Sequence, residues 1–583
     1  MVHRSSHRQT PHRAGVSKQG VFSNVPGPEL QRSVFDRSHT HKTTFGSSHQ
    51  NSDKTWSDDP SMLIPIFVDE TLPGDTLSLK MQSLVRMTTP LTPILDGLNI
   101  DFHAFFVPYR ILWDNWTKFL GAQDKPNDSL PAALPHLISD ASRPDMWKPG
   151  SLYDYMGIPT SQLPDAGDYI AQIQSLPFRA YNKIWNYWFR DENLQDSVHE
   201  DSGDVDTQGY SLLPRGKRKD YFTSALPWTQ KGGDVQIPLV DNHAIVEPGS
   251  QIDIGSDTND DHVGVRLGDW QGSSNDPNQI HPMHLNDFVT NGEGGLSIDG
   301  TKWPVGTPIK ALSGKVTDKS HLVVDLSFTG SSVNDIREAF QIQKFLERNA
   351  RGGTRIKEII KSHFGVTLSD SRIQWPEYLG GSTMPIGISA VPQTSSTDPT
   401  SPLGNLAAYS VNAGNLNFSK SFEEHGVVMI LASVRQSYTY SQGVNRMYLR
   451  QGRFDFYWPE FSHLGEQPVF RAELNANVSV TNWRDPFGFQ ERYAEYRFLP
   501  DRASGLMRPS AQDSLAFWHL GQLLGGDDGI PDTLSAGFIE ECPPVGRILA
   551  VPSQPHFLAD FFFSIKSARC MPVYSAPGLV DHF

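Results

Sequence analysis

The acidic residues of one polar segment have a spacing that could bind a calcium ion. Asp257, Asn259 and Asp261 occupy alternate positions, as the first oxygen ligands of a calcium-binding loop do. The sixth and twelfth positions of such a loop should be glycine and glutamate, but here they are His262 and Gly268. Because of these two mismatches, the sequence predicts no metal site.

Glu423, Glu424 and His425 could be drawn as an acid and a base, but they stand just before a predicted strand. Adjacent strand residues point to opposite faces, so we interpret this group as a polar entry to the strand. The chain also has none of the motifs of P-loop, dinucleotide-binding, zinc-protease or serine-hydrolase sites. We therefore expect no catalytic residues, no cofactor and no enzymatic activity.

The N-terminal segment is basic although the chain as a whole is acidic. The formal net charge is -15, so any contact with nucleic acid requires a locally basic segment. Arg4, Arg8, Arg13 and Lys18 are spaced along this segment, and no acidic residue precedes Glu29. These four cations are candidates for contact with nucleic-acid phosphates, and the alternative is a disordered tail without a ligand.

A second basic run, RGKRK, contains Arg215, Lys217, Arg218 and Lys219. Aromatic residues follow it closely, so the run could contact phosphates or an acidic neighbour. It could equally be a loop whose charges face water. The sequence leaves both readings open.

Aromatic residues recur at spacings of three and four between Leu176 and Asp191, which predicts an amphipathic helix. Core packing of this helix is the favoured role of Trp185 and Trp188. The alternative places Trp185, Trp188 and Arg190 in a contact between subunits, since tryptophan and arginine are enriched at the energetic centres of interfaces.

Short β-type runs separated by proline and glycine dominate the chain from Met62 onward. Strands near both ends of the sequence favour one sheet sandwich that is interrupted by large insertions. The predicted strands are Thr76–Gln82, Leu98–Phe106, Gly426–Val434, Ala472–Val480, Glu495–Leu499 and Phe557–Lys566, and two further helices are predicted over Asn334–Arg348 and Thr354–Phe364.

The composition divides the chain into four parts. Residues 1–60 are predicted to be an arm without a core of its own, and residues 61–232 the first part of the β fold with a helical insertion. Residues 233–326 are rich in Asp, Gly, Asn, Ser and Pro, which indicates an exposed insertion, and residues 327–583 complete the fold. No apolar run is long enough to span a bilayer, so we expect no membrane insertion. The absence of a secretory signal and the presence of only two cysteines fit folding in a reducing cytoplasm.

Long stretches of this chain resemble the major capsid protein of gokushoviruses, within the microvirus family. The resemblance covers most of the chain, including the C-terminal half through EYRFLPDRASG. The other segments that carry it are SLPFRAYNKIWNYWFRDENLQ at 175–195, RGKRKDYFTSALPW at 215–228, IQKFLERNARGGTRIKEIIKSHFG at 342–365 and PEYLGGSTMPI at 376–386.

The resemblance implies a mainly β fold: an eight-stranded antiparallel jelly roll of the viral capsid type, with long insertions and a few short helices. It implies a major capsid protein that self-assembles into a small T=1 icosahedral shell around a circular single-stranded DNA phage genome. The virion would be assembled in the cytoplasm of a host bacterium. The implied partners are other copies of the chain, the packaged DNA, a small basic internal phage protein and a host-cell surface receptor. Residues 1–60 would face the interior, and residues 233–326 would form a projection at the threefold axes that contacts the host.

A secreted glycan-binding or glycan-cleaving β-sandwich is the alternative, because it would share the acidic, aromatic, glycine- and proline-rich composition. Such a protein would have paired carboxylates in a cleft and would stay monomeric. A capsid subunit would instead sediment as a very large particle.

Overall fold

The computed structural model describes residues 33–46, 61–232, 333–365 and 374–573, apart from short gaps, together with six three-residue strands between 243 and 325. The chain forms two compact units. One comprises residues 1–229 and 352–583, and the other comprises residues 230–351. No helix among the described residues is long and apolar enough to cross a membrane.

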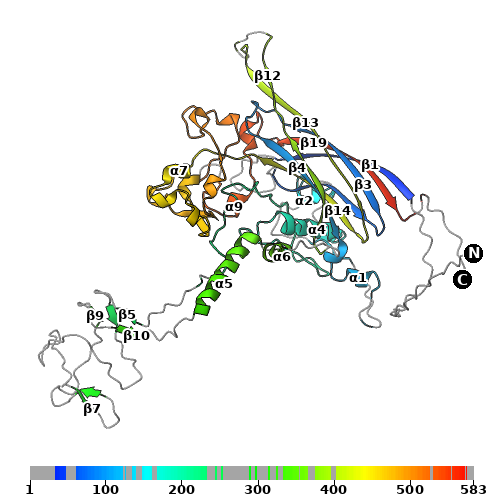
Figure 1. The fold of residues 1–583 in the computed structure, drawn as a ribbon. Helices are drawn as coiled ribbons and strands as arrows, with labels where there is room; N and C mark the ends of the chain where they lie inside the picture. The colour runs from blue at the N-terminus through cyan, green and yellow to red at the C-terminus, as the bar shows by residue number, and fades with distance from the viewer. Residues whose placement is uncertain are drawn as a thin grey trace, which may run out of the picture. The chain divides into compact units, whose positions relative to one another are not determined.

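Two antiparallel sheets form the centre of the first unit (Figure 1). The five-stranded sheet has the order β1 (Ser33–Phe45), β19 (Phe557–Arg569), β3 (Thr76–Met87), β13 (Leu406–Ser421) and β12 (Ser389–Pro392). The four-stranded sheet has the order β11 (Glu377–Pro385), β4 (Leu98–Pro108), β14 (Gly426–Gln436) and β2 (Ile64–Thr71).

The strand order is that of a jelly roll. Along the chain the long strands alternate between the two sheets, except that β4 and β11 are neighbours in the same one. The first long strand, β1, pairs with the last one, β19, in the five-stranded sheet. The mainly β, antiparallel jelly-roll prediction is confirmed, but the described sheets hold nine strands and not eight, because the short β12 adds to the end of β13.

The four-stranded sheet is buried on both faces, which explains the unbroken apolar run of β14. Val428 and Ile430 face the core between the sheets, whereas Val427 and Met429 face a second core on the outer side. Strand β3 instead alternates between buried and exposed residues, because only its inner face is covered. The outer face of the five-stranded sheet consequently carries polar residues.

Helix α4 (Leu176–Ile184) covers the outer face of the four-stranded sheet and continues as a π-helical turn over Trp185–Phe189. Helices α5 (Val333–Gly352) and α6 (Ile356–Phe364) also agree with prediction, and α6 ends at Gly365, whose φ of 70° suits glycine. The remaining α-helices are single turns: α1 (Trp116–Phe119), α2 (Leu152–Tyr155), α3 (Gly167–Ile170), α7 (Arg446–Leu449), α8 (Arg471–Leu474) and α9 (Ala536–Ile539).

A long excursion between β14 and β19 has its own core, to which Phe222, Val469, Leu474 and Phe538 contribute. Its short strands are β15 (Thr439–Tyr440), β16 (Glu466–Phe470), β17 (Pro486–Glu491) and β18 (Asp501–Arg502). In the second unit, the described strand pairs are β5 (His243–Ile245) with β10 (Val323–Asp325), β6 (Gln251–Asp253) with β9 (Ser313–Lys315), and β7 (Phe288–Thr290) with β8 (Leu296–Ile298).

Two predicted strands are wrong, and four strands of the two sheets, β1, β2, β11 and β13, were missed besides the short β12. Ala472–Val480 begins with helix α8 because the Glu473 carboxylate accepts a hydrogen bond from the Phe470 N–H and so starts a helical turn. Glu495–Leu499 begins in the 3-10 turn Ala494–Tyr496. Strand β1 lies inside the segment predicted to be an arm; it has little apolar alternation and is held by thirteen residue pairs with β19.

Candidate assembly surface

The four arm cations Arg4, Arg8, Arg13 and Lys18 lie outside the described residues. The second basic run is described, and half of it is buried inside the subunit. The Arg215 guanidinium donates to Ser433 Oγ at 2.8 Å and lies 3.4 Å from Asp101 Oδ2. The Lys217 ammonium lies over the rings of Tyr438 and Phe538, 4.9 and 4.6 Å from their centroids. Burial lowers the pKa of Lys217 to about 8.

The other two residues of the run are more exposed but also have partners. Arg218 Nη2 lies 3.7 Å from Asp101 Oδ1, and Lys219 Nζ lies 2.6 Å from Asp191 Oδ2. Burial raises the pKa of Asp101, but a hydrogen bond from Thr383 and the neighbouring arginines outweigh this effect and lower it. The run therefore joins the four-stranded sheet to the segment that follows α4.

Trp185 is buried, and its Nε1 donates to the Pro214 carbonyl at 2.7 Å. Trp188 is partly exposed and donates to the Pro376 carbonyl at 2.8 Å. Arg190 donates to the Gln195 carbonyl at 3.2 Å. The ring of Trp188 thus reaches the surface beside Tyr378, with ring centroids 5.6 Å apart.

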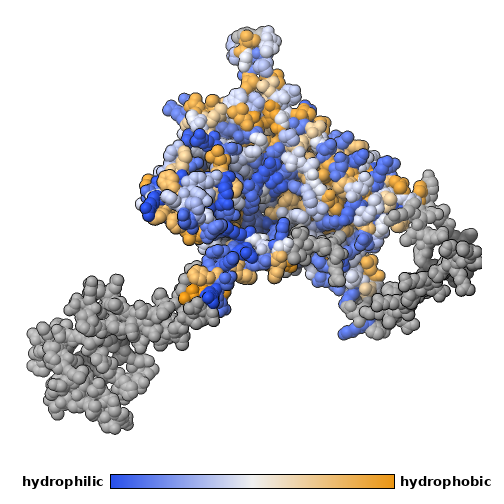
Figure 2. All heavy atoms as spheres, in the orientation of Figure 1, coloured by the Kyte–Doolittle hydropathy of each residue, from blue (hydrophilic) through white to orange (hydrophobic). Residues whose placement is uncertain are grey.

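A larger group of apolar side chains is exposed on the excursion between β14 and β19, a feature that the sequence reasoning missed. Apolar and charged residues lie side by side on this part of the molecule, around α7 (Figure 2). The signal for it was the dense arginine and aromatic content of residues 446–461. We call this group the aromatic surface; its members are Met447, Tyr448, Phe454, Phe456, Tyr457, Trp458, Leu464, Tyr496, Phe498 and Leu499.

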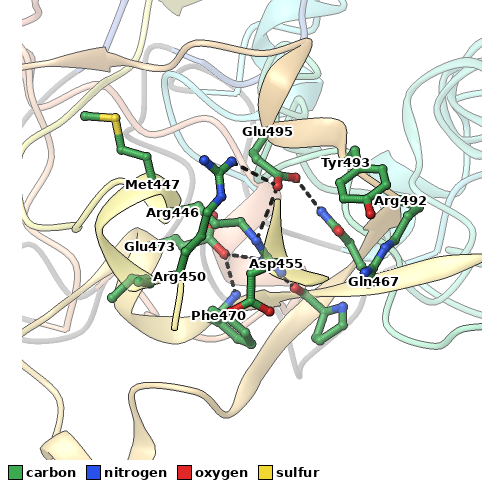
Figure 3. Close-up of polar contacts among 12 residues, drawn as sticks. Arg446, Met447, Arg450, Asp455, Gln467, Phe470, Glu473, Arg492, Tyr493 and Glu495 are labelled. Carbon is green, nitrogen blue, oxygen red and sulfur yellow. Dashed lines mark hydrogen bonds and ion pairs between the residues drawn. The ribbon is translucent and has the colours of Figure 1, made fainter. Parts of the chain in front are cut away.

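A buried ion pair joins α7, which carries Met447 of the aromatic surface, to α8 (Figure 3). Arg446 Nη1 lies 2.8 Å from Glu473 Oε1, and their side chains are 12% and 4% exposed. The same guanidinium nitrogen donates to the Pro468 carbonyl at 2.7 Å, and Tyr221 Oη donates to Glu473 Oε2 at 3.0 Å. Burial raises the pKa of Glu473, although Arg446 acts in the opposite direction.

Glu495 ties the next turn to this pair. Its Oε1 lies 3.7 Å from Arg446 Nε and 3.5 Å from Arg450 Nη2, while Gln467 donates to its Oε2 at 2.6 Å (Figure 3). The Arg450 guanidinium also lies over the rings of Phe456 and Tyr496, 5.2 and 4.6 Å from their centroids. These contacts hold exposed rings on a fixed base.

The chemistry of this arrangement suits protein contact and not catalysis. Each buried carboxylate is paired with arginine and accepts further hydrogen bonds. Exposed tyrosine, tryptophan, phenylalanine and arginine are the residue types that dominate interface energetics. Large apolar side chains exposed in such number within one part of the chain often mark a site of protein contact. Among the described residues, no group of three or more His, Cys, Asp or Glu side chains could hold a metal ion.

Comparison with known proteins gives consistent matches over nearly the whole chain. Residues 23–579 match the family described as capsid protein (F protein). The chain is 39% identical to capsid protein VP1 of Chlamydia phage 1, over 96% of this chain and 97% of the relative. It is 38% identical to capsid protein VP1 of Bdellovibrio phage phiMH2K, over 97% and 98%, and 34% identical to that of Spiroplasma virus 4, over 89% and 92%.

Proposed function

Since this chain belongs to the capsid protein (F protein) family, we propose that its shell encloses single-stranded DNA, with the outer face of the five-stranded sheet turned toward the genome. Membership makes the chain a major capsid protein, a structural component of the virion. It also removes the basis for the glycan-binding or glycan-cleaving alternative.

The two sheets differ in how their outer faces are covered, and this difference supports the proposed orientation. The outer face of the four-stranded sheet is covered by α4 and the second core. The outer face of the five-stranded sheet is open, and the alternation of buried and exposed residues in β3, β13 and β19 gives it Ser, Thr, Asn and Gln side chains mixed with charged and apolar ones. An open sheet face that offers polar groups and exposed aromatic rings is a common platform for single-stranded nucleic acid.

The charges on this face favour an anionic ligand. Asp560 pairs with Lys42, whereas Lys566 Nζ lies 3.9 Å from Asp36 with both side chains mostly exposed, so Lys566 can still turn to a phosphate. Lys80 has no hydrogen bond or ion pair with another described residue. Its strand neighbours on the same face include Phe562, which is exposed and offers a ring on which a base can stack.

The predicted arm enters this sheet at Ser33, where β1 begins. Arg4, Arg8, Arg13 and Lys18 therefore precede the edge strand of the proposed DNA-binding face. Each cation that neutralises a phosphate adds only a modest, salt-dependent contribution to the affinity for DNA. Many copies that act on one genome would make the total contact strong.

The double variant K80Q/K566Q, with and without F562S, tests the proposed face. Particles of these variants should contain less DNA, measured as the ratio of absorbance at 260 and 280 nm. For unassembled subunits that bind an oligothymidylate, loss of two phosphate contacts should make the salt slope shallower by about 1.4, from roughly 0.7 per contact. The matched control K344Q/K361Q removes two exposed charges from α5 and α6. Unchanged DNA content and an unchanged slope would contradict the orientation.

Two further roles extend the capsid function. Residues 233–326 would form the projection that contacts a host-cell receptor, because their composition is the least core-like of the chain. Particles that lack this segment should form but adsorb poorly to the host, and normal adsorption would refute the role. A small basic internal protein would neutralise genome charge beside the arm. Its removal should therefore make packaging more sensitive to replacement of Arg4, Arg8, Arg13 and Lys18 by glutamine.

A further inference from the structure

Strand β12 and the start of β13 form a two-stranded ribbon that extends past the end of the five-stranded sheet. Strand β13 pairs with β3 only from Ser410 onward, where Met87 ends β3. Residues 406–409 pair only with β12, from Pro392↔Leu406 to Ser389↔Tyr409. The ribbon stands clear of the rest of its unit (Figures 1 and 2).

The ribbon carries almost no charge although it is exposed. Between Ser389 and Tyr409 the only charged residue in the sequence is Asp398. Val391, Leu403 and Tyr409 are all exposed, Leu403 at 61%. Exposed sheet edges are usually protected by charges, and a two-stranded ribbon is marginally stable alone in water. A partner that covered the ribbon would shield its exposed edges and stabilise its two strands.

A hollow of about 640 Å³ lies at the same end of the sheet, on the opposite edge. The register fixes this placement: Phe45, Phe557, Met87 and Ser410 form one row across the four longer strands. The ribbon leaves the row on the β13 side, and the hollow lies on the β1 side. Its lining includes Gly46, Leu84, Arg86, Tyr155, Pro555 and Leu558.

The side chains that line the hollow are complementary to the ribbon in polarity and charge. Leu84 and Leu558 are about half exposed and supply an apolar floor. Arg86 has no hydrogen bond or ion pair with another described residue, so it can donate to the carbonyl oxygens of an incoming strand. The other charged residues of the lining are Lys42, Asp560 and Asp154; Lys42 pairs with Asp560, and Asp154 accepts a hydrogen bond from the Gly150 N–H at 2.9 Å, so little net charge opposes an almost uncharged ribbon.

We propose that the β12–β13 ribbon of one subunit inserts into the hollow beside β1 of a second copy of this chain. The contact is heterologous, because the two surfaces differ, and head-to-tail repetition around an axis beyond this end of the sheet closes a ring. The inference rests on the shell-forming function of the family, and the charge pattern of the ribbon argues for a copy of the chain over DNA as its occupant. The proposed DNA contact uses the more distant part of the sheet face, around Lys80 and Phe562.

Directed cross-linking tests the contact. One chain carries L403C, another carries L558C, and the two are co-expressed so that particles contain both. Oxidation should give a covalent dimer from the mixture and a ladder of higher oligomers when both cysteines are on one chain. Neither product should appear with either single variant alone, which controls for the native Cys542 and Cys570.

A second measurement separates this contact from general failure of folding. L403D and L558D should each reduce particle yield at least tenfold while the thermal midpoint of the subunit stays unchanged, because both leucines are exposed. L120D, at another exposed leucine, should assemble normally. Particles that form without cross-linking would overturn the ribbon contact. Cross-linked particles without DNA would leave it intact and refute the genome proposal.

Discussion

Arg446 and Glu473 form a 2.8 Å ion pair that is almost wholly buried, yet Arg446 stands two residues before Tyr448, which is among the most exposed aromatic side chains that the structure describes. Burial of both charges is costly unless each is fully hydrogen-bonded. The Pro468 carbonyl and the Tyr221 hydroxyl supply those further bonds. The pair therefore fixes the turns that present the aromatic surface.

Replacing Glu473 with glutamine should lower the free energy of unfolding of the unassembled subunit by about 3 kcal/mol, because the buried Arg446 charge then keeps only its longer, 3.7 Å contact with Glu495. Urea denaturation measures the change. E491Q is the control, because its ion pair with Arg497 is about half exposed and should contribute less than about 1 kcal/mol. Equal losses in the two variants would refute a supporting role for the buried pair.

Y448D and L499D should abolish assembly without changing the stability of the subunit. These side chains are 70% and 86% exposed, so substitution should change the free energy of unfolding by less than about 0.5 kcal/mol. A charge in a contact between subunits would instead prevent burial of the aromatic surface. Sedimentation should show subunits in place of particles. Normal particles from both variants would show that the aromatic surface faces solvent in the shell.

Gly443→Ala should be strongly destabilising, by at least about 3 kcal/mol, because a Cβ atom there would lie 1.8 Å from the Glu473 carbonyl oxygen. The backbone before α7 approaches that closely, and it must move if the side chain is added. Gly452→Ala is the matched control, since nothing lies within 4 Å of its Cβ position. Thermal unfolding of both variants tests the difference, and a similar midpoint would contradict the close approach.

Stability of the subunit should fall as pH decreases from about 6.5 to about 4. Burial lowers the pKa of His556 from 6.5 to about 4, and neither ring nitrogen has a hydrogen-bond partner in the described structure. The unfolded chain therefore binds a proton in this range that the folded chain does not, so protonation favours unfolding. The contribution is on the order of 2 to 3 kcal/mol, from about 1.4 kcal/mol per pKa unit.

The variant H556F should remove this part of the pH dependence. The free energy of unfolding should be measured by urea denaturation at pH 7 and pH 4 for both proteins. His103, whose pKa is lowered to about 3 by burial and by Arg215, adds a similar contribution that remains in the variant. An identical loss in the two proteins would exclude His556 as a source.

Sequence patterns predicted the elements whose burial is local and periodic. Strands β3, β4 and β19 and helix α4 were found because their apolar spacing matches a strand or helix period, and β14 was found from its short unbroken apolar run. Strand β1 was missed because backbone hydrogen bonds to a distant strand, and not apolar spacing, hold it in place. In Ala472–Val480 the alternation of apolar residues imitated a strand, although the Glu473 carboxylate starts a helical turn there.

Only those parts of the aromatic surface that come from one continuous segment could be predicted from the sequence. The aromatic run near Phe454 is visible in the sequence, but its ionic support joins Arg446 to Glu473 and Glu495 through three different turns. Likewise, no local pattern indicates that Arg215 pairs with Asp101, since the partners lie on different parts of the fold. Pairings at such separations are set by the topology of the sheets.

The pairing of β1 with β19 has a consequence for synthesis on the ribosome. Lys42 and its β19 partner Asp560 are 518 positions apart, so the five-stranded sheet stays incomplete until β19 has been translated. The row from Phe45 to Ser410, which places both the ribbon and the hollow, cannot form before then. A nascent chain in which β19 has not yet emerged therefore lacks the proposed docking hollow.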